Sequence, residues 1–385
     1  MKKKVLSLLL ASAMVVSLTA CGSSAPAQEA PAETPAATTE AEAPAAEEAP
    51  AAEATTDADS YELALVIDVG TIDDKSFNQG SWEGLQKYGE EKGVSYKYYK
   101  SAEATTDAFQ ETIELAIEGG AKVIVCPGFL FEEPIYNMQT AHPDVKFILI
   151  DGEPHDAEYN YKTEANTMPV LYQEDQAGFL AGYAAVKDGY TKLGFMGGMA
   201  LPAVIRYGYG YLAGADYAAN ELGVDVTVNY TYTGAFEATP EAQSTATGWY
   251  TTGTEVIFAC GGAVGNSVMA AAEASNGKVI GVDVDQSSES STVITSAMKM
   301  LSSSVYDAIT AAYDGSFPGG QTTVFDITND GVGIAMDTAQ FNSFTADDYK
   351  AIYDKLVAGE ITINNDVEAD TSALGLTKVS VNVIQ

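Results

Sequence analysis

From Tyr61 onward, short apolar runs alternate with longer segments of helical periodicity, and this alternation restricts the folds open to the chain. Runs rich in Val, Ile and Leu predict buried strands at 62–68, 94–100, 122–126, 145–151, 192–196, 224–230, 255–259 and 278–284. Helices are predicted at 76–92, 107–118, 131–141, 174–187, 203–222, 240–250 and 266–274. Such alternation is typical of parallel sheets covered by helices on both faces. The sequence therefore predicts an α/β fold.

The alternation stops and restarts midway, which divides the predicted elements into two halves of similar length. We expect two doubly wound, Rossmann-like lobes, with lobe 1 over 61–167 and lobe 2 over 168–286. The tail after Ser287 is less regular and is expected to recross between the lobes. On this interpretation about 287–320 complete lobe 1 and about 321–385 complete lobe 2.

The N-terminal 60 residues differ from the rest in composition. Residues 1–20 combine three lysines, an apolar run over 5–16 and a small-residue end, which predicts a secretory signal peptide. Residues 21–60 contain no Lys or Arg, nine acidic residues and five of the 13 prolines. This composition predicts a disordered, extended linker. We therefore expect an exported protein whose folded part starts near Tyr61.

The chain is strongly acidic. Its formal charge is −35, and the segment from Tyr61 onward has 45 acidic and 16 basic residues, a formal charge of −29. Such a surface repels nucleic acid and anionic lipid, so neither is an expected partner. Acidic residues also raise solubility, which is sufficient to explain the size of the excess.

Cysteine and histidine are scarce. Cys126 and Cys260 each lie in an apolar run and are interpreted as small buried hydrophobic residues, with a disulfide between them as the alternative outside the cytoplasm. The histidines are His142 and His155, and the latter is expected to be structural, in a surface loop. With so few Cys and His residues, no zinc site is predicted, and no metal or cofactor is assigned.

The first strand-to-helix loop, 68–79, carries the most polar groups. Ligands of open α/β sheets bind beyond the carboxyl ends of the strands, which places this loop at the expected ligand edge. Ser76 and Gln79 have the spacing of a capping box, so a helix should start at Ser76 with Phe77 and Asn78 in its first turn. Phe77 could serve as a core residue or stack on a flat ligand, and position alone leaves both readings open.

The loops after the other strands bring more aromatic, glycine and carboxylate groups to the same edge. These residues are Phe129, Phe236, Gly261, Gly262, Asp283, Asp285 and Gln286. The glycine pair could bring backbone N–H groups close to a ligand, but the Lys-Ser/Thr ending of a nucleoside triphosphate loop is missing. Aromatic faces with carboxylates suit a ligand that has a ring and a sugar, and they disfavour a polyanion.

An enzymatic site is less well supported. The spacing contains no Ser-His-Asp or Cys-His arrangement, so no catalytic residue is assigned. Asp68 and Asp283 could in principle act as paired carboxylates in glycoside hydrolysis, which leaves a lipid-anchored hydrolase as an alternative. Nothing in the sequence indicates the raised pKa that the acid of such a pair requires.

Several motifs occur in an order that identifies a family. They are Asp-Val-Gly-Thr-Ile-Asp-Asp-Lys-Ser-Phe-Asn-Gln (68–79), Gly-Gly (197–198) with Ala-Val-Ile (203–205), Tyr-Thr-Gly-Ala-Phe (232–236), Gly-Val-Asp-Val-Asp-Gln (281–286) and Thr-Ser-Ala-Met-Lys (295–299). With them, the chain resembles the basic membrane protein family of lipoproteins, which includes purine nucleoside receptors of bacterial ABC importers. Leu-Thr-Ala-Cys (18–21) also resembles a bacterial lipobox.

The resemblance implies a type I periplasmic-binding-protein fold, with two lobes joined by a hinge. It implies a purine sandwiched between Phe77 and Phe236 and a ribose held by Asp68, Asp283 and Lys299. Asn78, Gly261 and Gly262 lie at matching places, and Phe129 is expected near the pocket. It further implies lipidation at Cys21, attachment to the outer face of the cell membrane, delivery of the ligand to an ABC permease, and a monomer.

The match has departures. Ala235, Glu237 and Ala238 stand where many relatives carry Ser and a downstream Asp. The residue that binds the edge of the base is not placed by any motif, and Glu132 and Glu133 are the candidates. The alternatives are a receptor of the same fold for a sugar or sugar-derived signal, and a surface protein that is purely antigenic or adhesive.

Overall fold

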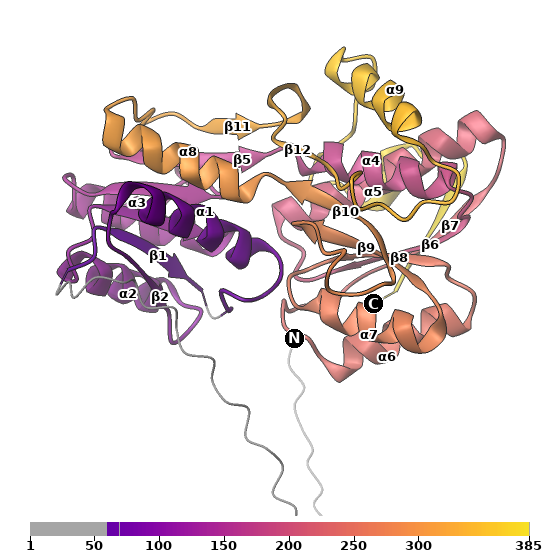
Figure 1. Ribbon diagram of the computed structural model, residues 1–385, viewed down its shortest axis with the longest axis horizontal. Coiled ribbons are helices and arrows are strands. Elements are labelled where there is room, and N and C mark those ends of the chain that lie inside the picture. Colours follow the sequence, from indigo (N-terminus) through magenta and orange to yellow (C-terminus); the bar gives the residue numbers. More distant parts are fainter. Residues whose placement is uncertain (1–59, 69, 385) are drawn as a thin grey trace, which may run out of the picture. The chain divides into compact units, whose positions relative to one another are not determined.

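The computed structural model describes residues 60–68 and 70–384. The predicted signal peptide, the predicted lipidation at Cys21 and nearly all of the predicted linker therefore lie outside the described residues. Within them, every predicted strand and helix is present, with boundaries that differ from the prediction by two residues at most. The strands form two sheets, each with helices on both faces (Figure 1).

The first sheet has six strands in the order β11-β5-β4-β3-β1-β2, and all of its pairs are parallel. Its strands are β1 (Leu63–Ile67), β2 (Tyr96–Lys100), β3 (Val123–Pro127), β4 (Lys146–Ile150), β5 (Thr167–Tyr172) and β11 (Thr323–Phe325). Its helices are α1 (Phe77–Lys92), α2 (Thr106–Glu118), α3 (Glu132–Ala141) and α8 (Leu301–Asp314). Alternate residues of β1 pack against α1 and α8 on one face and against α2 and α3 on the other, as expected for a central parallel strand.

The second sheet has seven strands in the order β12-β10-β9-β8-β6-β7-β13, and only the β10–β12 pair is antiparallel. Its strands are β6 (Lys192–Gly197), β7 (Val226–Tyr232), β8 (Val256–Cys260), β9 (Lys278–Asp283), β10 (Val293–Lys299), β12 (Val332–Ile334) and β13 (Val379–Val383). Helices α4 (Glu174–Lys187) and α5 (Pro202–Leu222) cover one face, and α6 (Pro240–Thr251) and α7 (Val264–Ser275) the other. The remaining helix is α9 (Ala346–Val357), and short 3₁₀ turns lie at Phe129–Phe131, Ile327–Asn329 and Thr371–Leu374.

The chain crosses between the sheets after β5, after β10 and after β11, so each lobe is built from separate stretches of sequence. These crossings do not coincide with the lobe boundaries expected from the sequence, near residues 167, 286 and 320. The first boundary differs because β5 was not recognised as a strand: it contains Pro169, and proline weakens the sequence signal of a strand. The second differs because β10 follows β9 directly and pairs with it in the second sheet.

Two smaller points concern membranes and thiols. None of the helices in the described part of the chain combines the length and apolarity that a bilayer-spanning helix requires. Cys126 in β3 and Cys260 in β8 are both buried free thiols, and their interpretation as small buried strand residues is confirmed. Burial raises the pKa of both thiols, so each is held in the protonated form.

Candidate functional site

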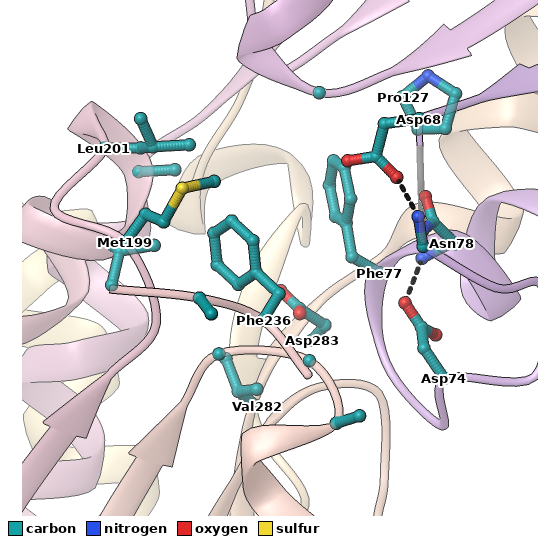
Figure 2. Close-up of a pocket in the computed structure, with 18 of the residues that line it drawn as sticks. Asp68, Asp74, Phe77, Asn78, Pro127, Met199, Leu201, Phe236, Val282 and Asp283 are labelled. Carbon is teal, nitrogen blue, oxygen red and sulfur yellow. Dashed lines mark hydrogen bonds between the residues drawn. The ribbon is translucent and has the colours of Figure 1, made fainter. Parts of the chain in front are cut away.

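A cavity of about 430 Å³ lies beyond the carboxyl ends of strands from both sheets. Its lining includes all nine residues that the sequence assigned to ligand binding, namely Asp68, Phe77, Asn78, Phe129, Phe236, Gly261, Gly262, Asp283 and Lys299. Figure 2 labels five of them, Asp68, Phe77, Asn78, Phe236 and Asp283. The cavity size is within the range of small-molecule sites in proteins, about 300–1,000 Å³. The structure thus brings the predicted residues together in one place.

The loop before α1 is held by carboxylates. Asp74 accepts backbone hydrogen bonds from Ser76, Asn78 and Gln79 at 2.9–3.1 Å, and so caps the helix. The predicted capping box is therefore wrong in detail: Ser76 is the N-cap residue, but its hydroxyl makes no capping bond. Burial raises the pKa of Asp74 to about 6, against the three backbone donors that favour its ionised form.

Asp68, at the end of β1, is tied to the same loop. Its Oδ1 accepts the backbone N–H of Gly70 at 2.8 Å, and the Asn78 side chain bonds to its carboxylate (Figure 2). Burial raises the pKa of Asp68, and the negative charge of Glu237 in the other lobe adds to that increase. A carboxylate of the second lobe thus acts across the cavity on Asp68 of the first lobe.

Phe77 and Phe236 come from different lobes and face the same cavity. Phe77 is the first residue of α1, and Phe236 lies in the loop after β7 (Figure 2). The glycine pair lies in the neighbouring loop after β8: a Cβ on Gly261 would lie 2.6 Å from the backbone nitrogen of Gly198, and Gly262 adopts a φ of +56°. The loops after β6 and β8 can therefore approach each other closely only because Gly261 has no side chain.

Asp283 ends β9 in a strained conformation. Its φ is +65°, and the N–H of Val284 bonds to the carbonyl of Val282 at 2.7 Å, which closes a γ-turn around it. The side chain is 7% exposed, and its Oδ2 accepts a hydrogen bond from the Ser76 hydroxyl of the other lobe at 2.5 Å. Burial raises the pKa of Asp283, an effect that the charge of Lys299 opposes.

Lys299, at the end of β10, is a member of a buried ion network. Its ammonium pairs with Asp151 and lies 3.1 Å from Oε1 of Glu174, whose other oxygen pairs with Arg206 at 2.6 Å. It also lies 5.1 Å from the centre of the Phe77 ring, within cation–π range. These carboxylates raise the pKa of Lys299, so its charge is fixed.

Sequence reasoning did not assign every residue of this cavity to the site, and three of those it missed carry polar groups. Asp151, Asp74 and Tyr207 all line it, and Asp151 has one oxygen, Oδ1, that is buried without a hydrogen-bond partner in the described chain. The rule that placed Asp283 also applies to Asp151, which directly follows β4 and likewise has a positive φ of 60°. The sequence therefore contained the information needed to predict Asp151 as a residue of the site.

The candidates for the base edge do not line the cavity. Glu132 is buried, accepts the backbone N–H of Glu153 at 2.7 Å and is hydrogen-bonded to Nε2 of His155 at 3.1 Å, while Glu133 accepts a bond from the Thr106 hydroxyl. Burial raises the pKa of Glu132 to about 7. His155 is 7% exposed and therefore buried, although the sequence predicted a surface loop, and its structural role stays a prediction. No group of three or more metal-ligating side chains forms among residues 60–68 and 70–384.

The family model described as "ABC transporter substrate-binding protein PnrA-like" matches residues 61–367. The chain belongs to this family. Among similar relatives, "ABC transporter nucleoside-binding protein BmpA" of Lactococcus lactis subsp. cremoris is 30% identical over 78% of this chain and 88% of its own. "Basic membrane protein A1" of Borrelia garinii subsp. bavariensis is 31% identical over 71% and 79%. The resemblance found from the motifs is thereby confirmed.

Solved structures agree on the fold. An ABC-transporter solute-binding protein from Aeropyrum pernix matches with a TM-score of 0.70, at 23% identity over 82% of this chain and 95% of that one. A second, from Conexibacter woesei, matches with a TM-score of 0.63. These structural similarities confirm the predicted two-lobe, type I periplasmic-binding-protein fold. Together with the family match, they identify the chain as a substrate-binding protein of an ABC transporter.

Proposed function

We propose that this PnrA-like protein captures a nucleoside, with a purine base, between its two lobes. It is anchored through a lipid on Cys21 to the outer face of the cell membrane, and it delivers the nucleoside to an ABC permease. It makes and breaks no covalent bond. Its relative in Lactococcus lactis, named as a nucleoside-binding protein, supports the ligand class.

The observation that carries the proposal is the pair of rings from different lobes that border one cavity, Phe77 and Phe236 (Figure 2). A flat base between them contacts both lobes at once and stabilises their approach. An aromatic pair contributes about 0.5–1.5 kcal/mol beyond the area it buries. A sugar without an aromatic base gains none of this stacking, so the rings favour a nucleoside over a simple sugar.

The polar groups of the cavity favour an uncharged ligand with many hydrogen-bond donors. Asp68, Asp151 and Asp283 line the cavity, and carboxylates accept hydrogen bonds from hydroxyl and amino groups. A phosphate would meet the same negative charges, while the ammonium of Lys299 is already paired with two carboxylates. The proposal is therefore restricted to nucleosides and excludes nucleotides.

A thermal-shift screen of the mature chain, unfolded and refolded to remove bound ligand, tests the class. Ligands would be ribosides, free bases, nucleotides and sugars. A ligand at 100 times its Kd stabilises the folded state by about 2.7 kcal/mol, which is easily measured. We expect stabilisation by purine ribosides only. A shift caused by a sugar, with none from any nucleoside, would keep the fold and refute the function.

Substitutions test the roles of individual groups. Phe77→Ala and Phe236→Ala should each raise the nucleoside Kd by roughly tenfold or more, because each removes a stacking face and its buried area. Tyr313→Ala, which removes a half-exposed aromatic outside the cavity, is the matched control and should leave Kd unchanged. Asp283→Ala should weaken ribosides more than free bases; equal losses would mean that Asp283 does not bind the sugar.

The anchor is tested separately. Cys21→Ser should leave the Kd for the nucleoside unchanged and move the protein from the membrane fraction to the medium. Retention in the membrane fraction would show that the protein is held there by something other than a lipid on Cys21.

A further inference from the structure

Two hydrogen bonds connect the two lobes immediately beside the cavity. The Ser76 hydroxyl donates to Oδ2 of Asp283 at 2.5 Å, and Nε2 of Gln286 donates to the carbonyl of Lys75 at 2.7 Å. Ser76 and Lys75 belong to the loop before α1 in the first lobe, and Asp283 and Gln286 follow β9 in the second. Neither Ser76 nor Gln286 borders the cavity.

These bonds are shielded from water. Ser76 is fully buried, Gln286 is 2% exposed and Asp283 is 7% exposed. A buried polar group that loses its partner has no water to replace it, so each bond strongly favours the arrangement in which it forms. The nearby ion pair between Lys75 and Glu289 has a longer separation of 4.0 Å and exposed side chains, and such pairs contribute little.

Gln286 also supports the strained turn at Asp283. Its Oε1 accepts the N–H of Val282 at 3.0 Å, and its own N–H donates to Oγ of Ser296 at 3.0 Å. One amide side chain thus binds the turn within its own lobe and the loop of the other lobe. A residue held at a φ of +65° needs such support, because the conformation is unfavourable for a residue with a side chain.

The hydroxyl of Ser76 is available for this contact because another residue caps α1. An N-cap serine ordinarily bonds to the backbone N–H groups of its own helix. Here Asp74 accepts those groups, and the serine hydroxyl points across to Asp283 instead. The arrangement is therefore built for a contact between lobes and is not required by the helix itself.

We propose that Ser76, Asp283, Gln286 and the Lys75 carbonyl form a cleft latch, which holds Asp283 in position for the ligand and forms only when the lobes are closed. The proposal rests on the nucleoside-binding function proposed above. Ser76 binds Oδ2 and the Tyr207 side chain also bonds to this carboxylate, so the remaining lone pairs of Asp283 accept the hydrogen bond from the ligand. Ser76 and Gln286 are thus positioning residues, which act through Asp283 and through closure.

The consequence is a link between recognition and closure. Apparent affinity equals intrinsic affinity multiplied by the fraction of protein in the binding-competent state, so a weaker latch lowers affinity for all ribosides by a common factor. Loss of a hydrogen bond to a charged group changes an equilibrium constant by roughly tenfold to hundredfold. Ser76→Ala should raise the Kd of all bound ribosides by a common factor in that range.

The test combines calorimetric Kd values with a distance between lobes. Spin labels at Lys92→Cys in α1 and Ser244→Cys in α6, both exposed sites, report lobe separation in the Cys21→Ser chain. Ser76→Ala should weaken binding uniformly and shift the ligand-bound distance distribution toward the open form. Gln286→Met, which removes the donor to Lys75, should have the same effects.

Ser81→Ala is the matched control. Ser81 is a fully buried serine of the same helix, and its hydroxyl bonds to the carbonyl of Phe77 within the first lobe. It should leave the distance distribution unchanged. If Ser76→Ala and Gln286→Met both kept the wild-type Kd and distances, the latch would be disproved. If wild-type protein bound no nucleoside, the proposed function would fail, and the unliganded distances would decide the latch: a shift in Ser76→Ala supports it, and no shift overturns it.

Discussion

Replacing Lys299 by methionine should destabilise the ligand-free protein strongly, because the ammonium is a buried counter-ion as well as a group at the cavity. Lys299 is 4% exposed and pairs with Asp151 and Glu174. Glu174 keeps Arg206 as a partner when the lysine is removed, but Asp151 loses its only ion pair among the described residues. The expected cost is therefore concentrated on one carboxylate.

The magnitude follows from that burial. Removing one partner of a buried ion pair costs about 3–5 kcal/mol in free energy of unfolding, because the remaining charge has neither water nor a counter-charge. Methionine has a similar length to lysine, so loss of volume adds little. Asp151→Asn in the same chain removes the stranded charge, and the double variant should regain most of the lost stability.

The pH dependence provides an independent check on the cause. Burial raises the pKa of Asp151 to about 6, and Lys299 acts against this increase, so its loss raises that pKa further. A carboxyl group with a raised pKa in the folded state destabilises the protein above that pKa, and the effect is relieved as pH falls toward the unfolded value of about 3.9. The deficit of Lys299→Met should thus be largest near pH 8 and shrink toward pH 5.

The assay is urea unfolding of ligand-free protein followed by circular dichroism, for the wild type, both single variants and the double variant. Wild-type stability in Lys299→Met, with binding lost, would mean that the ammonium serves only the ligand and would refute the counter-ion role. A double variant no more stable than Lys299→Met would place the cost elsewhere than on Asp151.

Three further substitutions test packing and buried charge. A Cβ on Gly214 of α5 would lie 1.9 Å from the carbonyl oxygen of Phe179 in α4. Gly214→Ala should therefore lower the melting temperature and reduce the free energy of unfolding by about 1–3 kcal/mol or more. Gly248→Ala is the control: this glycine lies in a helix with open space around it, so the substitution should be neutral or stabilising by up to about 1 kcal/mol. Burial raises the pKa of Asp175 to about 6, two units above its unfolded value, so Asp175→Asn should stabilise the protein by up to about 3 kcal/mol at pH 7.5 and by nothing near pH 4. A pH-independent difference would contradict the second prediction.

Most of the fold could be predicted because its strands are buried on both faces. Leu63–Ile67 and Val256–Cys260, for example, are fully apolar and fully buried, and such runs between helical segments leave little choice of architecture. The prediction was wrong where local signals conflict with tertiary contacts. β5 pairs within a parallel sheet although it contains Pro169, because neighbouring strands on both sides hold it in place.

The candidate site could be located from the sequence, but the bonding within it could not. The rule that ligands bind at strand ends requires only the order of elements, and it pointed to eight residues that line one cavity; the family resemblance added Lys299. The partners of Ser76 and Lys299 lie 207 and 148 residues away along the chain. A local motif such as a capping box carries no information on such contacts, so the sequence assigned Ser76 to its own helix and left Lys299 unpaired.

Backbone strain marks the same place. In the described chain, six residues other than glycine have a positive φ, and Lys75, Asp151 and Asp283 are three of them. All three lie where a strand end or loop of one lobe meets the other lobe or a crossing segment. Such conformations persist only where surrounding contacts determine them, and here those contacts are the latch bonds and the pairs of Lys299. Because the latch bonds form on closure, the strain at Lys75 and Asp283 belongs to the closed state, and ligand binding must supply the free energy that maintains it.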